Sequence, residues 1–291
     1  MNNENPSKRG LIKPLDLVLI DLDKTLIDSN YKLTVSEEKF QRIVKKLDDR
    51  KILVGLCSDS AIPSLVQWAK RLGIKGPLIA ERGAVVFDQE SKTKKIVSPR
   101  ETDWLLDFRS AFIDESLQAF PKATFVIGDA VDIVQNKKLF SATIDQLLII
   151  NGLRIASFSI YTRHFSGRSS LMQMDTNLLN KVSSLALKLL PSFDKSKMDL
   201  FWDKNPDYGL LIIHSKTSAK SNGIRFAKRH LNLQKITMIG DDMSDYVNLP
   251  YVSQFAVRNA TANYKKKCNF VATKNFTEGV IESIEELLRG K

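Results

Sequence analysis

Three short apolar runs stand out in the pattern of hydrophobic and polar positions along the chain. Residues 17–20, 51–57 and 236–239 are mostly apolar, and each run ends abruptly in polar side chains. A short, nearly unbroken apolar run of this kind is typical of a strand buried on both faces of a parallel sheet. The pattern therefore predicts three buried strands whose ends carry polar groups.

Helical periodicity follows the first two runs. In residues 36–50 the apolar positions recur three or four residues apart, with Ser36 as the expected N-cap and acidic residues in the first turn. Residues 62–74 repeat this amphipathic pattern, and Gly73 closes it. Two successive strand–helix units predict a parallel sheet.

The pattern changes at residues 77–98, where two strand-like pieces flank a polar turn and so indicate a hairpin. We place a boundary near Gly83 and expect residues 84–210 to form an α+β insertion. Residues 16–83 and 211–291 then form one core, preceded by a flexible leader at 1–15. The predicted fold is α/β, a Rossmann-like doubly wound parallel sheet with an inserted α+β domain.

Within the insertion, residues 104–120 and 177–190 are predicted helices, and residues 154–162 a strand. Three cationic or titratable residues follow that strand and are candidates to face a substrate. A solvated loop is the favoured alternative for them, since charged side chains prefer the surface. They are Arg163, His164 and Arg168.

Composition narrows the class of protein. The 291 residues are 43% hydrophobic, contain no stretch near the ~18 apolar residues of a membrane span, and begin without the apolar region of a signal peptide. We expect a soluble, cytoplasmic protein. Cys57 and Cys268 make neither a disulfide framework nor a metal cluster, so both are expected to be reduced packing residues.

The net charge of +11 is compatible with anionic substrates or with nucleic acid. A solvated basic surface is the simpler interpretation, because no block of Arg and Lys with interleaved aromatic residues occurs. Nucleic acid is therefore an unlikely partner, and the sequence leaves the oligomeric state open.

The candidate chemistry lies at the ends of the apolar runs. Along an extended segment, Asp21 and Asp23 can point to one site, where two carboxylates repel unless a proton or a cation intervenes. Asp241 follows the third run, with Asp245 one helical turn beyond it. Lys220 lies just before a helix predicted to begin at residue 221 or 222, a position suited to an anion.

These residues occur in the order of four motifs that resemble those of the haloacid dehalogenase superfamily of phosphohydrolases. The insertion between the second and third motifs, and the C-terminal tail, resemble the branch with an α/β cap. That branch includes Cof-type sugar phosphatases, sucrose-phosphate, mannosyl-3-phosphoglycerate and phosphoglycolate phosphatases, and phosphomannomutases. The matching residues are Asp21-Leu22-Asp23-Lys24-Thr25, then Ser58, then Lys220, then Gly240-Asp241-Asp242-Met243-Ser244-Asp245.

The resemblance implies a role for each candidate. Asp21 would be the nucleophile that forms an aspartyl-phosphate, and Asp23 the general acid and base. Mg²⁺ would be held by Asp21, Asp241 and the backbone carbonyl of Asp23. Ser58 and Lys220 would bind phosphate oxygens. Thr25 would tighten the acidic turn. Asp245 would bind a metal-bound water or orient Lys220.

Four positions depart from the family pattern without removing a catalytic group. Lys24 replaces a glycine, Ser58-Asp59-Ser60 replaces Thr-Gly-Arg, and Arg82 and Ser244 each replace an asparagine. The missing arginine argues against assigning a sugar phosphate by analogy. An alternative register, the Asp-Lys-Thr of ion-pumping ATPases, would make Asp23 the nucleophile, but the following Gly-Thr and the membrane helices of those pumps are absent.

The sequence thus predicts a magnesium-dependent phosphomonoester hydrolase that acts on a small phosphorylated metabolite, such as a sugar phosphate or a phosphoglycolate- or phosphoglycerate-type ester. Two alternatives stay open. One is a phosphomutase of the phosphomannomutase kind, which returns the phosphoryl group to a sugar. The other is a non-catalytic module that uses its basic surface to bind nucleic acid or another polyanion. Taken alone, the first acidic motif is also compatible with a polar turn that caps a helix.

Overall fold

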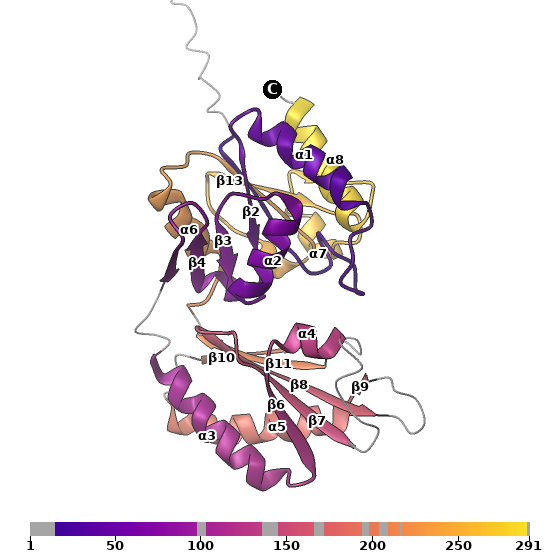
Figure 1. The fold of residues 1–291 in the computed structure, drawn as a ribbon. Coiled ribbons are helices and arrows are strands. Elements are labelled where there is room, and N and C mark those ends of the chain that lie inside the picture. Colours follow the sequence, from indigo (N-terminus) through magenta and orange to yellow (C-terminus); the bar gives the residue numbers. More distant parts are fainter. Residues whose placement is uncertain are drawn as a thin grey trace, which may run out of the picture.

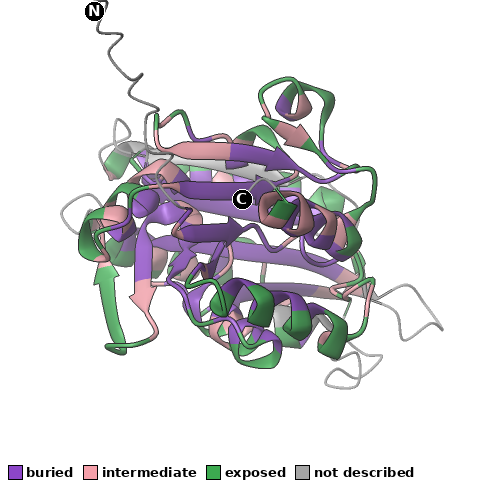
Figure 2. Cartoon of the chain, turned by 90° about the horizontal axis from the view of Figure 1, so that it is seen from above, coloured by how far each residue is buried: buried purple, intermediate pink, exposed green. Residues whose placement is uncertain are grey.

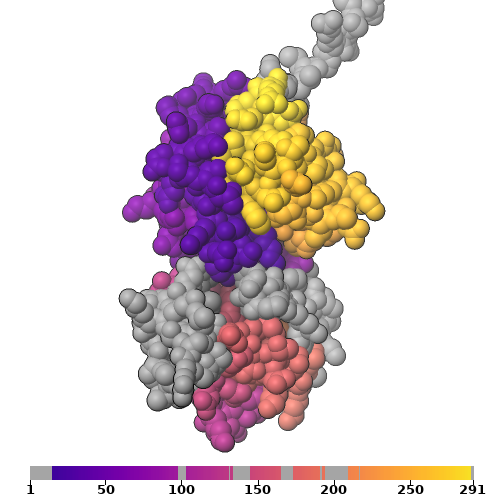
Figure 3. All heavy atoms as spheres, turned by 90° about the vertical axis from the view of Figure 1, so that its right-hand side faces the viewer, coloured from indigo at the N-terminus to yellow at the C-terminus, as the bar shows by residue number. Residues whose placement is uncertain are grey.

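The computed structural model describes residues 15–97, 103–135, 145–165, 172–193, 198–203, 209–215 and 217–289. Residues 1–14 of the predicted leader, and Arg168, lie outside these ranges. The described residues form two lobes, each built on one sheet (Figure 1). Segments from both ends of the chain lie side by side in the first lobe, and the middle of the chain forms the second (Figure 3).

The sheet of the first lobe has eight strands: the first six in sheet order run parallel, and the last two form a hairpin whose inner strand is antiparallel to its neighbours on both sides. In sheet order they are β14 (Phe270–Val271), β13 (Val252–Ala256), β12 (Ile236–Gly240), β1 (Leu17–Ile20), β2 (Leu53–Cys57), β3 (Leu78–Ala80), β4 (Val85–Asp88) and β5 (Thr93–Ile96).

Helices cover both faces of this sheet, so the doubly wound α/β fold is confirmed. Alternate side chains of β1 point to opposite faces: Val18 and Ile20 pack in one core cluster, Leu17 and Leu19 in another. The first cluster lies under α1 (Glu37–Asp48), α2 (Ile62–Leu72), α7 (Ala262–Lys265) and α8 (Phe276–Arg289), the second under α6 (Lys220–His230). The central strands are buried, while the edge strand β5 and the outer sides of the helices are exposed (Figure 2).

Local sequence signals act where they were expected. The Ser36 side chain accepts a hydrogen bond from the backbone N–H of Lys39 (3.3 Å) and caps α1. Gly73 ends α2 in the left-handed conformation, with φ of 69°. Helix α6 begins at Lys220 itself, slightly earlier than predicted. Both cysteines are free thiols, and Cys57 is fully buried.

The second lobe has a mixed sheet whose two faces differ in what covers them. Helices α3 and α5 pack on the face that points away from the first lobe, and the other face turns toward it (Figure 1). The strands in sheet order are β10 (Met198–Asp203), β11 (Leu210–Ser215), β8 (Ser157–Phe165), β7 (Gln146–Asn151) and β6 (Ala123–Gly128), with β9 (Met172–Met174) beside β8. The helices are α3 (Asp103–Ala119), α4 (Ala130–Gln135) and α5 (Thr176–Leu189), followed by a 3₁₀ turn at Leu190–Ser192.

Two segments belong to a different sheet from the one implied by the predicted domain boundaries at residues 84 and 211. The β4–β5 hairpin pairs with β3 and so extends the first sheet, although it was predicted to open the insertion. Strand β11 pairs with β8 and β10 in the second sheet, although residues from 211 were assigned to the core. A buried apolar strand has the same pattern in either sheet, so the pattern alone could not decide these pairings.

Candidate active site

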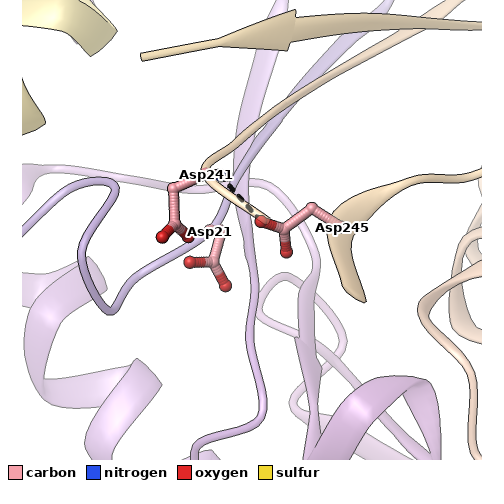
Figure 4. A group of neighbouring side chains, drawn as sticks. All are labelled: Asp21, Asp241 and Asp245. Atoms are coloured by element: carbon pink, nitrogen blue, oxygen red, sulfur yellow. Dashed lines mark hydrogen bonds between the residues drawn. The ribbon is translucent and has the colours of Figure 1, made fainter. Parts of the chain in front are cut away.

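The acidic residues of the first and fourth motifs meet because β1 and β12 are parallel neighbours in register. Ile20 pairs with Ile239, and the next residues bring Asp21 and Asp241 out at the same edge of the sheet. Carboxylate oxygens of Asp21, Asp241 and Asp245 lie within 4.8 Å of one another. Figure 4 shows the three side chains converging.

Asp245 is locked into the turn that follows β12. It ends a 3₁₀ turn (Met243–Asp245), is 1% exposed, and its Oδ2 accepts hydrogen bonds from the backbone N–H of Asp241 (2.8 Å) and Asp242 (3.1 Å). A Cβ atom on Gly240 would lie 2.4 Å from this oxygen. Glycine at 240 therefore makes room for the Asp245 carboxylate.

Lys220 connects the first motif to the fourth, because its amine contacts a carboxylate of each. This buried lysine, the first residue of α6, donates from Nζ to Asp21 Oδ1 (2.6 Å) and to Asp245 Oδ1 (2.5 Å). The backbone before α6 is held against the 3₁₀ turn Glu81–Gly83, where a Cβ on Gly83 would lie 2.2 Å from the Ala219 carbonyl oxygen. Close packing of these two turns thus sets the position of the amine.

Hydroxyl groups orient the remaining carboxylates. Ser60 donates from Oγ to Asp23 Oδ2 (3.2 Å), and its backbone N–H donates to Ser58 Oγ (3.1 Å). Thr25 donates from Oγ1 to Asp241 Oδ1 (3.1 Å). Ser60 had no predicted role of its own, since a serine two residues after Ser58 carries no distinctive signal.

Burial and mutual repulsion disturb the titration of the carboxyl groups. Burial, followed by the charge of Asp245, raises the pKa of Asp21 well above its usual value and that of Asp241 to about 7. Burial also raises the pKa of Asp23, against the hydrogen bond from Ser60. Burial disfavours the charged amine of Lys220, yet Asp21 and Asp245 together raise its pKa well above normal.

This cluster suits a hard divalent cation. The donors are carboxylate oxygens, and the buried Asp21 and the half-buried Asp241 carry raised pKa values that a cation would reverse. Asp245 is the least available ligand, because one oxygen accepts two backbone N–H groups and the other accepts from Lys220. Asp21 and Asp241 therefore fit best as side-chain ligands.

The cluster opens into a cavity of about 170 Å³ between the two lobes. The first lobe contributes the acidic groups together with Ser58 and Lys220. Residues that departed from the family pattern, including Lys24, Asp59 and Ser244, also line it. The second lobe contributes Arg154, Tyr161, Leu210 and Ile212.

Of the three candidates to face a substrate, Arg163 and His164 do not line this cavity, and Arg168 lies outside the described residues. Arg163 lies within β8 rather than in a solvated loop, is buried, and donates from Nη1 to the Thr162 carbonyl oxygen (2.8 Å). His164 is half-buried in the same strand. Arg154, before that strand, does line the cavity. Its sequence signal, a single cation beside an apolar strand, was too weak to single out.

No helix in the described ranges is both long enough and apolar enough to cross a membrane.

Comparison with known proteins gives a consistent result. The family model of haloacid dehalogenase-like hydrolases matches residues 18–284. A phosphoglycolate phosphatase from Thermoplasma volcanium is 25% identical over 271 residues, which cover 92% of this chain and 96% of that protein. Among solved structures, a haloacid dehalogenase-like hydrolase from Bacteroides thetaiotaomicron has a TM-score of 0.64 at 18% identity, covering 94% of this chain and 99% of its own. A protein from Thermotoga maritima has a TM-score of 0.60 at 18% identity, with coverages of 94% and 97%.

Proposed function

Because the chain belongs to the haloacid dehalogenase-like hydrolase family, we propose that it is a magnesium-dependent phosphatase of small phosphorylated metabolites. The observation that carries the proposal is the convergence of Asp21, Asp241 and Lys220 in a cavity between the lobes. Its similarity to a phosphoglycolate phosphatase along 92% of the chain supports 2-phosphoglycolate as the first substrate to test.

In the proposed reaction, Asp21 attacks phosphorus and the ester bond to the leaving alkoxide breaks, which leaves an aspartyl-phosphate. Asp23 gives its proton to the alkoxide, and burial, which raises its pKa, favours the protonated form that this step needs. The same carboxylate then takes a proton from water, which attacks phosphorus and regenerates Asp21. The bond between the Asp21 oxygen and phosphorus breaks in this step, and inorganic phosphate leaves.

Other residues of the chain hold the phosphoryl group and its charge. The Lys220 amine, which donates to Asp21, and the Ser58 hydroxyl line the cavity and would bind phosphate oxygens as charge develops on them. Asp21, Asp241 and the Asp23 carbonyl would hold Mg²⁺, which when bound neutralises charge on the phosphate and the carboxylates. The second lobe closes the cavity and so limits water and substrate size.

The proposal is tested by phosphate release from a panel of phosphorylated metabolites, with and without Mg²⁺. Wild-type activity should need Mg²⁺, and Asp21→Asn should lower it by at least ~10³-fold, since the nucleophile is lost. Asp49→Asn, which makes the same change at an exposed site, is the matched control.

Two results would argue against this function. If neither p-nitrophenyl phosphate nor any panel member is hydrolysed by the wild type, the chain is not a phosphatase of this kind. If turnover requires an added sugar bisphosphate and returns phosphate to a sugar, the protein is a phosphomutase.

A further inference from the structure

Arg154 is a buried cation that lines the cavity and has no part in the reaction proposed above. It is 6% exposed and comes from the loop between β7 and β8 of the second lobe. Its Nη1 donates to Ser157 Oγ (2.8 Å), while its Nε is buried and has no hydrogen-bond partner in the described part of the chain. A buried guanidinium with an unused N–H is costly unless a further acceptor arrives.

The loop that carries Arg154 is held by the first lobe. Glu81, 1% exposed, accepts hydrogen bonds from the backbone N–H of Ile155 (3.0 Å) and Ala156 (2.9 Å) and from Ser157 Oγ (2.7 Å). The Ser157 hydroxyl therefore links the Glu81 carboxylate to the Arg154 guanidinium. The guanidinium is oriented before any ligand enters, which lowers the entropic cost of binding.

The surroundings of Arg154 define what it can bind. Tyr161, also nearly buried, lines the cavity beside apolar Leu210 and Ile212. Arg154 and Tyr161 line the same cavity as Asp23, the residue that would protonate the leaving group. A planar fork of N–H donors beside apolar walls matches a carboxylate in particular. The cavity of about 170 Å³ leaves room for a short molecule between this fork and Lys220.

We propose that Arg154 is a specificity-determining residue that binds the carboxylate of the substrate, so that the enzyme selects short phosphorylated carboxylic acids over neutral phosphate esters. The inference rests on the proposed function, because the phosphoryl group must occupy the Asp21 end of the cavity. Glu81 and Ser157 act as positioning residues for the guanidinium.

The test compares 2-phosphoglycolate with ethyl phosphate, in which a methyl group replaces the carboxylate. For the wild type we expect kcat/KM to favour 2-phosphoglycolate by at least ~10²-fold, because the analogue leaves the buried Nε–H of the guanidinium without an acceptor. Arg154→Met should lower kcat/KM for 2-phosphoglycolate by about 10- to 100-fold and change that for ethyl phosphate by less than about 3-fold. Arg154→Lys should recover part of the preference, and Arg42→Met, at an exposed site on α1, should leave it intact.

Binding separates this inference from the proposed function. Calorimetry on Asp21→Asn protein should show 2-phosphoglycolate binding more tightly than ethyl phosphate, and the addition of Arg154→Met should abolish the difference. A preference that survives Arg154→Met in folded protein, or an equal loss for both ligands, would overturn the role of Arg154 while leaving the phosphatase intact. Absence of turnover in the wild type would instead contradict the proposed phosphatase activity, and the binding comparison would still decide the role of Arg154.

Discussion

At the scale of single residues, the site is a cluster of buried like charges offset in part by one buried lysine among the described residues. Asp21 and Asp241 carry raised pKa values because burial and neighbouring carboxylates disfavour their charged forms. Lys220 forms ion pairs with Asp21 and Asp245, whereas Asp241 accepts a hydrogen bond from the Thr25 hydroxyl. The cluster is therefore expected to be stable at neutral pH only when a cation joins it.

Metal-free protein should lose stability as pH rises toward neutrality. The folded-state pKa of Asp241 is about 7 against an ordinary 3.8, so the folded form binds the proton more tightly than the unfolded chain does. This contribution is fully present below about pH 4 and is lost as pH rises through 7. Thermal unfolding with a chelator present should show the decline, and Mg²⁺ at 100 times its Kd should restore about 2.7 kcal/mol at pH 7.5.

Asp241→Asn should remove most of both effects, since it has no charge to desolvate and is a weaker ligand. Asp114→Asn, on the exposed side of α3, should keep them. An Mg²⁺-dependent stabilisation of equal size in Asp241→Asn would show that the ion binds elsewhere.

At the scale of elements, the site depends on the contact between the turn at Glu81–Gly83 and the start of α6. Gly83 has φ of 87°, and both it and Gly223 allow backbone and side chains to approach more closely than any Cβ would permit. This contact positions Lys220 against the end of β1. A residue far from the chemistry in sequence thereby controls where the amine lies.

Gly83→Ala should therefore lower both stability and activity. The added Cβ meets the Ala219 carbonyl and also strains a left-handed backbone, so we expect a loss of about 2–4 kcal/mol in the free energy of unfolding and at least a tenfold loss in kcat/KM. Gly73→Ala is the matched control, because its φ is 69° but no atom lies within 4 Å of the new Cβ. It should cost about 1–2 kcal/mol and leave kcat/KM unchanged. Equal activities of the two folded variants would contradict this view of the contact.

At the scale of the whole molecule, Glu81 links the two lobes that enclose the cavity. Three donors from the second lobe converge on its carboxylate, and the residue itself lies in the first lobe, in the 3₁₀ turn between β3 and β4. A carboxylate that accepts three hydrogen bonds in a buried position couples the lobes more strongly than exposed ion pairs do.

Glu81→Gln should weaken this link, because the carboxamide offers one acceptor oxygen and turns an NH₂ group toward N–H donors. We expect faster hydrogen exchange at the amides of Ile155 and Ala156, by about 10- to 100-fold, while the amides of β1 keep their protection. Mass spectrometry of exchanged peptides provides the measurement, and Glu90→Gln, in the β4–β5 turn, provides the control. Unchanged exchange at Ile155 and Ala156 would show that other contacts hold the loop.

The sequence by itself determined the family and much of the first lobe. Buried parallel strands have a distinctive apolar pattern, and the signals at Ser36 and Gly73 are local, so these elements followed from short-range chemistry. It also singled out Asp21 and Asp241, because they follow buried strands, and ligands of α/β sheets bind beyond the carboxyl ends of such strands. Their catalytic and metal-binding roles stay predictions.

Only the tertiary structure decided which distant groups meet. The β4–β5 hairpin and β11 each belong to the other sheet from the one predicted, since strand pairing depends on neighbours that a local pattern does not contain. The Arg154 side chain lines the cavity and that of Arg163 does not, because the orientation of both side chains depends on how the second sheet is placed against the first. The hydrogen bonds of Glu81 and the closeness of Gly83 to α6 likewise arise from contacts between segments that are far apart along the chain.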